Sequence, residues 1–140
     1  MTAMDQSKYV QILNKYKDII SSPPDLILTE DPSTGDYFVS LNIAFNPHPR
    51  YGSTRLRIRE KYNSSEELYF YRYCWEMNCK PTGNISAWEN EHSHGLDSDP
   101  HHHHHVPYDR KPVQNNHSIR TLEDAFKVIV HYITSGNNYP

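Results

Sequence analysis

The alternation of apolar and polar side chains over residues 37–77 constrains the fold of this 140-residue chain more than any other feature. In "DYFVSLNIAF" every second side chain is apolar from Tyr37 to Phe45, as expected for a strand with one buried face. The segment "STRLRIREKY" alternates in the same way, with Leu56 and Ile58 on one face and arginines on the other. Both segments therefore predict antiparallel strands of a half-buried sheet.

Three further segments are expected to join this sheet, at residues 25–30, 68–77 and 84–90. Each is rich in apolar, aromatic or β-branched side chains, and turn signals containing Gly, Pro, Asn or Asp separate most of them. The short link "NSSEE" makes residues 68–77 the partner of the preceding strand in a hairpin. The sequence thus predicts about five antiparallel strands.

The hydrophobic period changes from 2 to 3.6 at both ends of the chain, which predicts two helices. The first covers about residues 5–20, with Asp5 or Ser7 as its cap. Its apolar stripe contains Tyr9, Leu13, Tyr16 and Ile20. The second begins at Thr121, which is spaced from Asp124 as in a capping box. Together these elements predict an α+β fold in which both helices cover one face of the sheet.

Composition excludes several classes of protein. The net charge is −3, so contact with nucleic acid would require a local cationic patch. Cys74 and Cys79 are too few for a disulfide scaffold, which favours a reducing compartment. No apolar run approaches the roughly 18–20 residues of a membrane helix, and the first residues lack the pattern of a secretory signal. We expect a single soluble cytoplasmic domain over residues 1–140.

The cations of "STRLRIREKY" form either a solvated strand face or a stripe that binds phosphates. They are Arg55, Arg57, Arg59 and Lys61. One register of the hairpin places them beside an aromatic row, which would make a platform for single-stranded nucleic acid. That row is Tyr69, Tyr71, Tyr73 and Trp75. A shift by one residue moves the row into the core, and we favour this register because aromatic rows are more often buried.

Glu60 interrupts the apolar face of the same strand, since it alternates with Leu56 and Ile58. Burying an unpaired carboxylate costs several kcal/mol, so the residue requires hydrogen bonds, a cation or water. Two interpretations stay open. Glu60 either reaches water at the end of the strand or belongs to a site in which it orients a histidine or a substrate hydroxyl.

Residues 91–118 carry no periodic signal but contain eight of the ten histidines. Loops of this length inside a domain are usually functional or disordered. The run of five histidines at 101–105 lies inside the chain, so it is not a purification tag. In an extended segment His102 and His104 share one face. Because imidazoles titrate near neutral pH, this pair can supply the acid and the base for RNA cleavage by 2′-hydroxyl attack.

Zinc binding is an alternative use of the same side chains. Ligands could come from His92, His94, His102, His104 and Glu89. The spacing lacks the C-x-x-C or H-E-x-x-H patterns of common zinc sites, so it is a weak signal for a metal. Histidines on the surface with no role are a third interpretation.

Four short sequence motifs follow one another along the chain: G-S with a later Glu, Y-x-Y-x-W, W-x-N, and P-H-H-x-H. Their residues are Gly52, Ser53, Glu60, Tyr71, Tyr73, Trp75, Trp88, Asn90, Pro100, His101, His102 and His104. From about residue 37 onward the chain resembles the TumE family of toxins through these motifs. Glu89 replaces the usual Asp of the third motif, and Ser93 stands at an expected histidine, so His94 or His92 must substitute.

This resemblance implies a growth-inhibiting toxin of a type II toxin–antitoxin pair. It also implies a cognate antitoxin as partner, usually a helix-turn-helix DNA-binding protein from the neighbouring gene. From the residues themselves we predict a metal-independent ribonuclease with RNA as its substrate. His102 and His104 would be acid and base, and Glu60 would orient one of them, with His94 and Tyr73 in the same site.

The predicted substrate-binding residues are Arg59, Arg72, Tyr71, Trp75, Trp88, Asn90 and His101, with Arg59 or Arg72 meeting the phosphate. This mechanism needs no cofactor. One alternative is a zinc-dependent phosphodiesterase or hydrolase that uses the histidines as ligands. The other is a non-enzymatic module in which the histidine-rich loop docks a partner protein.

Overall fold

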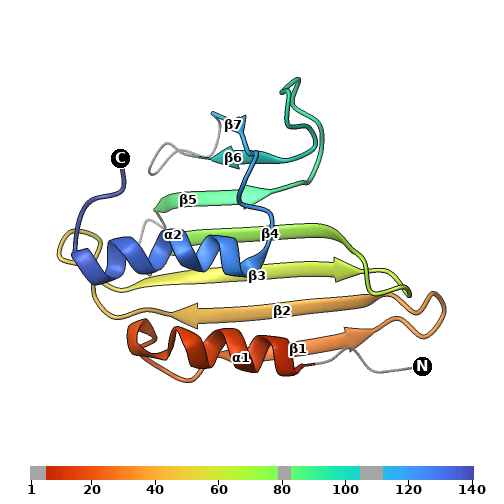
Figure 1. Cartoon of the computed structure of the whole chain (residues 1–140), viewed down its shortest axis with the longest axis horizontal. Helices are drawn as coiled ribbons and strands as arrows, with labels where there is room; N and C mark the ends of the chain where they lie inside the picture. The colour runs from red at the N-terminus through yellow and green to blue at the C-terminus, as the bar shows by residue number, and fades with distance from the viewer. Residues whose placement is uncertain (1–5, 79–82, 105–111) are drawn as a thin grey trace.

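A computed structural model of the chain describes residues 6–78, 83–104 and 112–140. The predictions made for Asp5, Cys79 and His105 therefore lie outside the described residues. Figure 1 shows two helices packed against one face of an antiparallel sheet. The predicted α+β class is confirmed, but the described sheet has seven strands rather than about five.

The elements follow each other in a simple order along the chain. They are α1 (Ser7–Lys15), a single 3-10 turn η1 (Lys17–Ile19), β1 (Asp25–Glu30), β2 (Tyr37–Ala44), β3 (Thr54–Tyr62), β4 (Leu68–Met77), β5 (Asn84–Glu89), β6 (His102–His104), β7 (Gln114–Asn115) and α2 (Leu122–Ser135). The sheet order is β1-β2-β3-β4-β5-β6-β7, and each strand is antiparallel to its neighbours. No helix in the described part of the chain is long and apolar enough to cross a membrane.

Two elements differ from the prediction. The first helix was expected to continue to residue 20, but it ends at Lys15 because Tyr16 leaves helical geometry, with φ −107° and ψ 18°. Residues 91–118 were expected to be loop, yet they contain β6 and β7. These strands have only three and two residues and no apolar alternation, so no period of 2 could reveal them.

The register between β3 and β4 is the one that buries Tyr71, Tyr73 and Trp75 of the aromatic row, whereas Tyr69 stays 46 % exposed. Leu56 lies opposite Trp75 and Ile58 lies opposite Tyr73, and all four side chains are fully buried. The favoured register is thus confirmed, and the platform of arginines beside tyrosines is wrong. The core lies between this face of the sheet and the two helices, where Tyr16 of the α1–η1 segment stacks on Phe126 of α2.

The predicted capping box at the start of α2 is also present. Thr121 Oγ1 accepts a hydrogen bond from the backbone N–H of Asp124, and the Asp124 carboxylate accepts one from the N–H of Thr121. The helix ends at Gly136, whose φ of 73° lies in the left-handed region that favours glycine. Both ends of α2 are therefore determined by local sequence.

Glu60 is buried beneath α1, with 3 % of its surface exposed, so the interpretation in which it reaches water is wrong. Its carboxylate accepts hydrogen bonds of 2.5 Å from Tyr9 Oη and Tyr73 Oη, and one of 3.2 Å from Tyr62 Oη. Lys8 Nζ in turn donates to Tyr62 Oη at 2.6 Å. Burial and then the Glu60 charge raise the pKa of Tyr9 and of Tyr73, so both hydroxyls keep the protons that they donate. These hydrogen bonds attach α1 to β3 and β4.

Replacing Tyr9 with Phe tests this attachment, because it keeps the ring and removes one donor to a buried carboxylate. We expect Tyr9→Phe to lower the free energy of unfolding by about 1–3 kcal/mol, measured by urea denaturation. Tyr69→Phe is the matched control, since Tyr69 Oη donates to Asp36 at an exposed position. It should change stability by no more than about 0.5 kcal/mol. Equal losses in the two variants would contradict the role assigned to the Glu60 hydrogen bonds.

Candidate functional site

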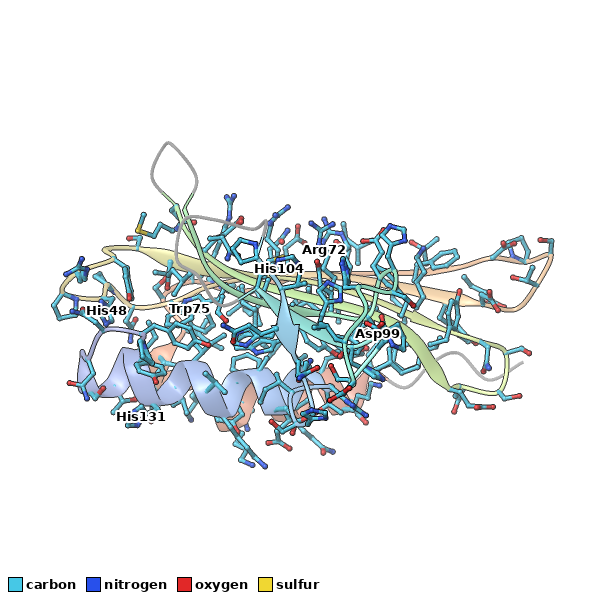
Figure 2. All side chains as sticks on the ribbon, turned by 90° about the horizontal axis from the view of Figure 1, so that it is seen from above. His48, Arg72, Trp75, Asp99, His104 and His131 are labelled. Carbon is cyan, nitrogen blue, oxygen red and sulfur yellow. The ribbon has the colours of Figure 1, made fainter. Side chains whose placement is uncertain are left out.

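The face of the sheet turned away from α1 and α2, called the open face below, carries a concentration of charged side chains. In Figure 2 Arg72 and His104 lie on this side, whereas Trp75 lies on the side of α2. On β3, β4 and β5 the open face has five cations and two carboxylates. They are Arg55, Arg57, Arg59, Lys61, Arg72, Glu76 and Glu89. This part of the face is therefore cationic although the whole chain has a net charge of −3.

Strand register places two of the three histidines of β6, His102 and His104, on the same face as these charges. Directly opposed residues of antiparallel strands share a face. One row across the sheet pairs Arg59 with Arg72, Arg72 with Glu89, and Glu89 with His102. In the adjacent row Ala87 lies opposite His104. Because neighbouring strands are about 4.8 Å apart, the row extends roughly 14 Å from Arg59 to His102.

Glu89 connects the members of this site. Its Oε1 lies 3.3 Å from His102 Nε2 and 2.8 Å from His104 Nε2. Its Oε2 lies 2.9 Å from Nε of Arg72. The exposed fractions of Glu89, His102 and His104 are 5 %, 1 % and 6 %, so their polar atoms face each other rather than bulk water. We call these three residues the Glu89 cluster.

The other ring nitrogens of the cluster have different surroundings. His102 Nδ1 lies 3.1 Å from the backbone oxygen of Pro100. A carbonyl can only accept, so this contact is a hydrogen bond in the tautomer whose Nδ1 carries the proton. His104 Nδ1 is buried and has no hydrogen-bond partner among the described residues.

The loop before β6 holds a third imidazole next to the cluster. The His94 ring is exposed, and its centroid lies 4.2 Å from that of His102. The Asp99 carboxylate fixes this loop by accepting hydrogen bonds from the N–H groups of His94, Gly95 and Leu96, at 2.9–3.1 Å. These donors, that of His94 first, lower the pKa of Asp99. The loop thus keeps the exposed His94 ring beside His102 of the cluster.

The cations of β3 differ in their partners. Arg55 and Arg57 both pair with Glu76, each through a distance of 2.7 Å. Among the described residues Arg59 has no carboxylate partner, and it donates to the backbone oxygen of Ile58. Lys61 lies over the rings of Phe38 and Phe70, at 5.8 and 4.8 Å. Of the described cations of β3, Arg59 and Lys61 thus have no carboxylate partner, and with Phe38 they line a hollow of about 260 Å³.

The structure brings only some of the predicted site residues together. His102, His104 and Arg72 meet at Glu89, with His94 adjacent and Arg59 farther along the same row. The expectation that Glu60 orients a histidine is wrong. Glu60 points to the opposite face, where tyrosine hydroxyls are its partners, and the carboxylate that contacts both histidines is Glu89. Tyr73 is also outside the site, because its hydroxyl is bound to Glu60.

The aromatic and amide residues predicted to bind substrate have partners in the folded chain. Tyr71, Trp75 and Trp88 are buried, with at most 2 % of their surfaces exposed. The Asn90 side chain bonds to the backbone of β4, accepting from Tyr71 N and donating to the oxygen of Tyr69. Their positions indicate packing rather than contact with a ligand.

His101 lies on the covered side, where its Nδ1 is 2.9 Å from Tyr71 Oη. Burial, followed by the charges of Arg120 and His102, lowers the pKa of His101. The imidazole is therefore more readily neutral than an ordinary one. Of the alternative zinc ligands, His92 does not join the cluster, since its side chain is 78 % exposed and pairs with Glu91.

Sequence reasoning missed the central role of Glu89 and the contribution of Phe38 and Phe70. Glu89 was considered as a possible zinc ligand and as the replacement for a family Asp, but not as the carboxylate that contacts Arg72 and both histidines. Its strand, β5, is buried along its whole length and shows no alternation. A signal did exist for the two phenylalanines. Each occupies a polar position in the alternation of its strand, so Phe38 and Phe70 must face the same side as the arginines.

Comparison with known proteins gives one match. The family model described as Toxin TumE matches residues 10–135, which is most of the chain. No curated protein matches, and no solved structure matches.

The ion pair between Arg72 and Glu89 is expected to stabilise the fold. Arg72→Ala removes a cation beside a buried carboxylate, so we expect the free energy of unfolding to fall by about 1–3 kcal/mol. Arg59→Ala on the neighbouring strand should change it by no more than about 0.5 kcal/mol. Urea unfolding of both variants measures the difference. If Arg59→Ala proves equally destabilising, the pairing is not what stabilises Glu89.

Proposed function

Because the chain belongs to the TumE toxin family, we propose that it is the toxin of a type II toxin–antitoxin pair and that it cleaves RNA at the Glu89 cluster. One observation carries this proposal. Two histidines and a carboxylate converge beside Arg72 on the cationic face of the sheet. Phosphodiester cleavage requires proton transfer and positive charge at one place, and this arrangement offers both.

The reaction class is transesterification within the RNA strand. The 2′-oxygen attacks the adjacent phosphorus and loses its proton, while the bond from phosphorus to the 5′-oxygen breaks. The leaving 5′-oxygen takes up a proton, so the products are a 2′,3′-cyclic phosphate and a 5′-hydroxyl end. No net oxidation or additional reactant is involved. The negative charge that develops on the phosphoryl oxygens requires cations close to the phosphorus.

The open face supplies such cations along a line. Arg72 lies at the Glu89 cluster, where it would meet the reacting phosphate. Arg59 follows on the next strand, where it would contact a neighbouring phosphate of the RNA strand. Phe38 and Phe70 beside Lys61 offer ring faces on which a base can stack. These features favour single-stranded RNA.

Two chemistries can serve the reaction at this cluster. In one, imidazoles of His102, His104 or the adjacent His94 take and return the protons without a metal. In the other, the cluster binds a metal ion that stabilises charge on the phosphoryl group. Both chemistries depend on His102 and His104 and lead to the same bond cleavage.

Family membership implies a cognate antitoxin. We propose that this antitoxin is a small helix-turn-helix DNA-binding protein encoded by the neighbouring gene. The non-enzymatic alternative, in which the histidine-rich segment only docks a partner, makes a different prediction. It allows the antitoxin complex to form but predicts that RNA in expressing cells stays intact.

Substitution at the cluster tests the proposed activity. We expect His102→Ala and His104→Ala to relieve growth arrest and to lower RNA cleavage by at least about 100-fold, the lower range for loss of a proton-transfer group. His131→Ala is the matched control, because His131 is exposed on α2 on the other side of the sheet. Circular dichroism checks that each variant is folded. Full toxicity in both cluster variants would refute the assignment.

Salt dependence tests the proposed path of the RNA strand. Each phosphate contact adds roughly 0.7 to the slope of log affinity against log salt for a single strand. We therefore expect Arg59→Ala to weaken binding of a non-cleavable RNA analogue and to reduce this slope by about 0.7. Lys127→Ala removes an exposed cation of α2 and should leave the slope unchanged. Equal slopes for wild type and Arg59→Ala would exclude Arg59 from the RNA path.

A further inference from the structure

We propose that Glu89, His102 and His104 bind one divalent transition-metal ion of the zinc type on the open face. Each residue offers one ligand atom, and these three atoms lie within 4.8 Å of one another. The two imidazole Nε2 atoms both point at Glu89 Oε1, at 3.3 and 2.8 Å. Ligands about 2.0–2.2 Å from a tetrahedral zinc ion lie roughly 3.3–3.6 Å from each other. The contact between His102 Nε2 and Glu89 Oε1 already has this spacing, and the His104 side chain would have to shift to bind the same ion.

The tautomer of His102 favours a cation at this point. In the tautomer whose Nδ1 donates to the carbonyl of Pro100, Nε2 of a neutral His102 ring carries a lone pair. That lone pair is directed at a carboxylate oxygen 3.3 Å away, and two electron-rich atoms at this distance repel each other. A carbonyl that fixes the outer nitrogen of an imidazole is a usual feature of metal-binding histidines.

Burial makes the need for a cation stronger. His102 is 1 % exposed and Glu89 is 5 % exposed, so bulk water does not separate their lone pairs. Arg72 balances the opposite oxygen of Glu89, Oε2, and does not lie between Oε1 and the histidines. A metal ion bound here would contact Nε2 of both histidines and Glu89 Oε1 at once.

The set of ligands indicates the class of metal. Two imidazoles and one carboxylate suit zinc and other late first-row ions rather than magnesium or calcium, which prefer oxygen ligands. Three protein ligands leave a position for another group, as in catalytic zinc sites. The His94 ring lies beside the cluster, with its centroid 4.2 Å from that of His102.

This inference rests on the proposed function only for its catalytic consequence, and the site can bind an ion whatever the substrate is. In the proposed reaction the ion would add positive charge beside Arg72, where charge develops on the phosphoryl oxygens. The metal chemistry would then replace the metal-independent one that the sequence favours. The ligand set is smaller than the five residues considered from sequence, since it contains Glu89, His102 and His104 but not the exposed His92.

The test is titration of the metal-stripped, tag-free, full-length chain with Zn²⁺, and with Co²⁺ for its absorption spectrum. A run of five histidines binds metals on its own, so the variants must separate the two sources. Glu89→Gln removes the carboxylate ligand without changing the run. His101→Gln is the matched control, because it shortens the run at a residue that faces Tyr71 instead of the cluster. His104→Gln is a second ligand variant.

We expect one tight site per wild-type chain, accompanied by a Co²⁺ spectrum of low coordination number and a higher Tm with Zn²⁺. Glu89→Gln and His104→Gln should each weaken this site more than about 10-fold, whereas His101→Gln should keep it. Equal uptake by all variants would show binding by the histidine run and would overturn the proposal, as would the lack of a tight site in the wild-type chain. These outcomes do not depend on RNA cleavage: a metal-loaded chain that leaves RNA intact refutes the proposed function and not the site.

Discussion

The register of β3 against β4 is the constraint on which the rest of the structure depends. With Ile58 opposite Tyr73, every large aromatic of β4 from Tyr71 to Trp75 faces the helices. The same register places Arg59 opposite Arg72 on the other side. A slip of one residue would bury arginines and expose tyrosines, at a cost of many kcal/mol, so hydrophobic burial selects this register. The cationic open face is therefore a consequence of how the core is packed.

Much of this arrangement could be predicted from the sequence where a regular period exists. The strands around Leu41 and Ile58 and the inward direction of Glu60 follow from a period of 2, and the capping box of α2 follows from the spacing of Thr121 and Asp124. The site could be predicted only in part. His102 and His104 were recognised by residue type, but their partner depends on which strand lies next to β6. That pairing joins residues 13–15 positions apart through an irregular loop, and no local pattern encodes it.

Glu60 and Glu89 show why a buried carboxylate does not reveal its role from sequence alone. Both lie on strands and both are almost completely buried. Glu60 receives neutral hydroxyl donors from Tyr9, Tyr62 and Tyr73, so it attaches a helix to the sheet. Glu89 instead contacts Arg72 and two imidazoles, groups that can bind ligands and exchange protons. The difference lies in the partners, which come from distant parts of the chain.

The strand that carries His102 and His104, β6, and its neighbour β7 form one border of the described sheet and are its shortest strands. β6 has three residues and β7 two, compared with nine in β3 and ten in β4. A border attached by so few ladder bonds can detach in brief local openings while the long central strands stay paired. The long central strands therefore maintain the fold. The candidate site lies at the short border strands, which can open and close again locally without global unfolding.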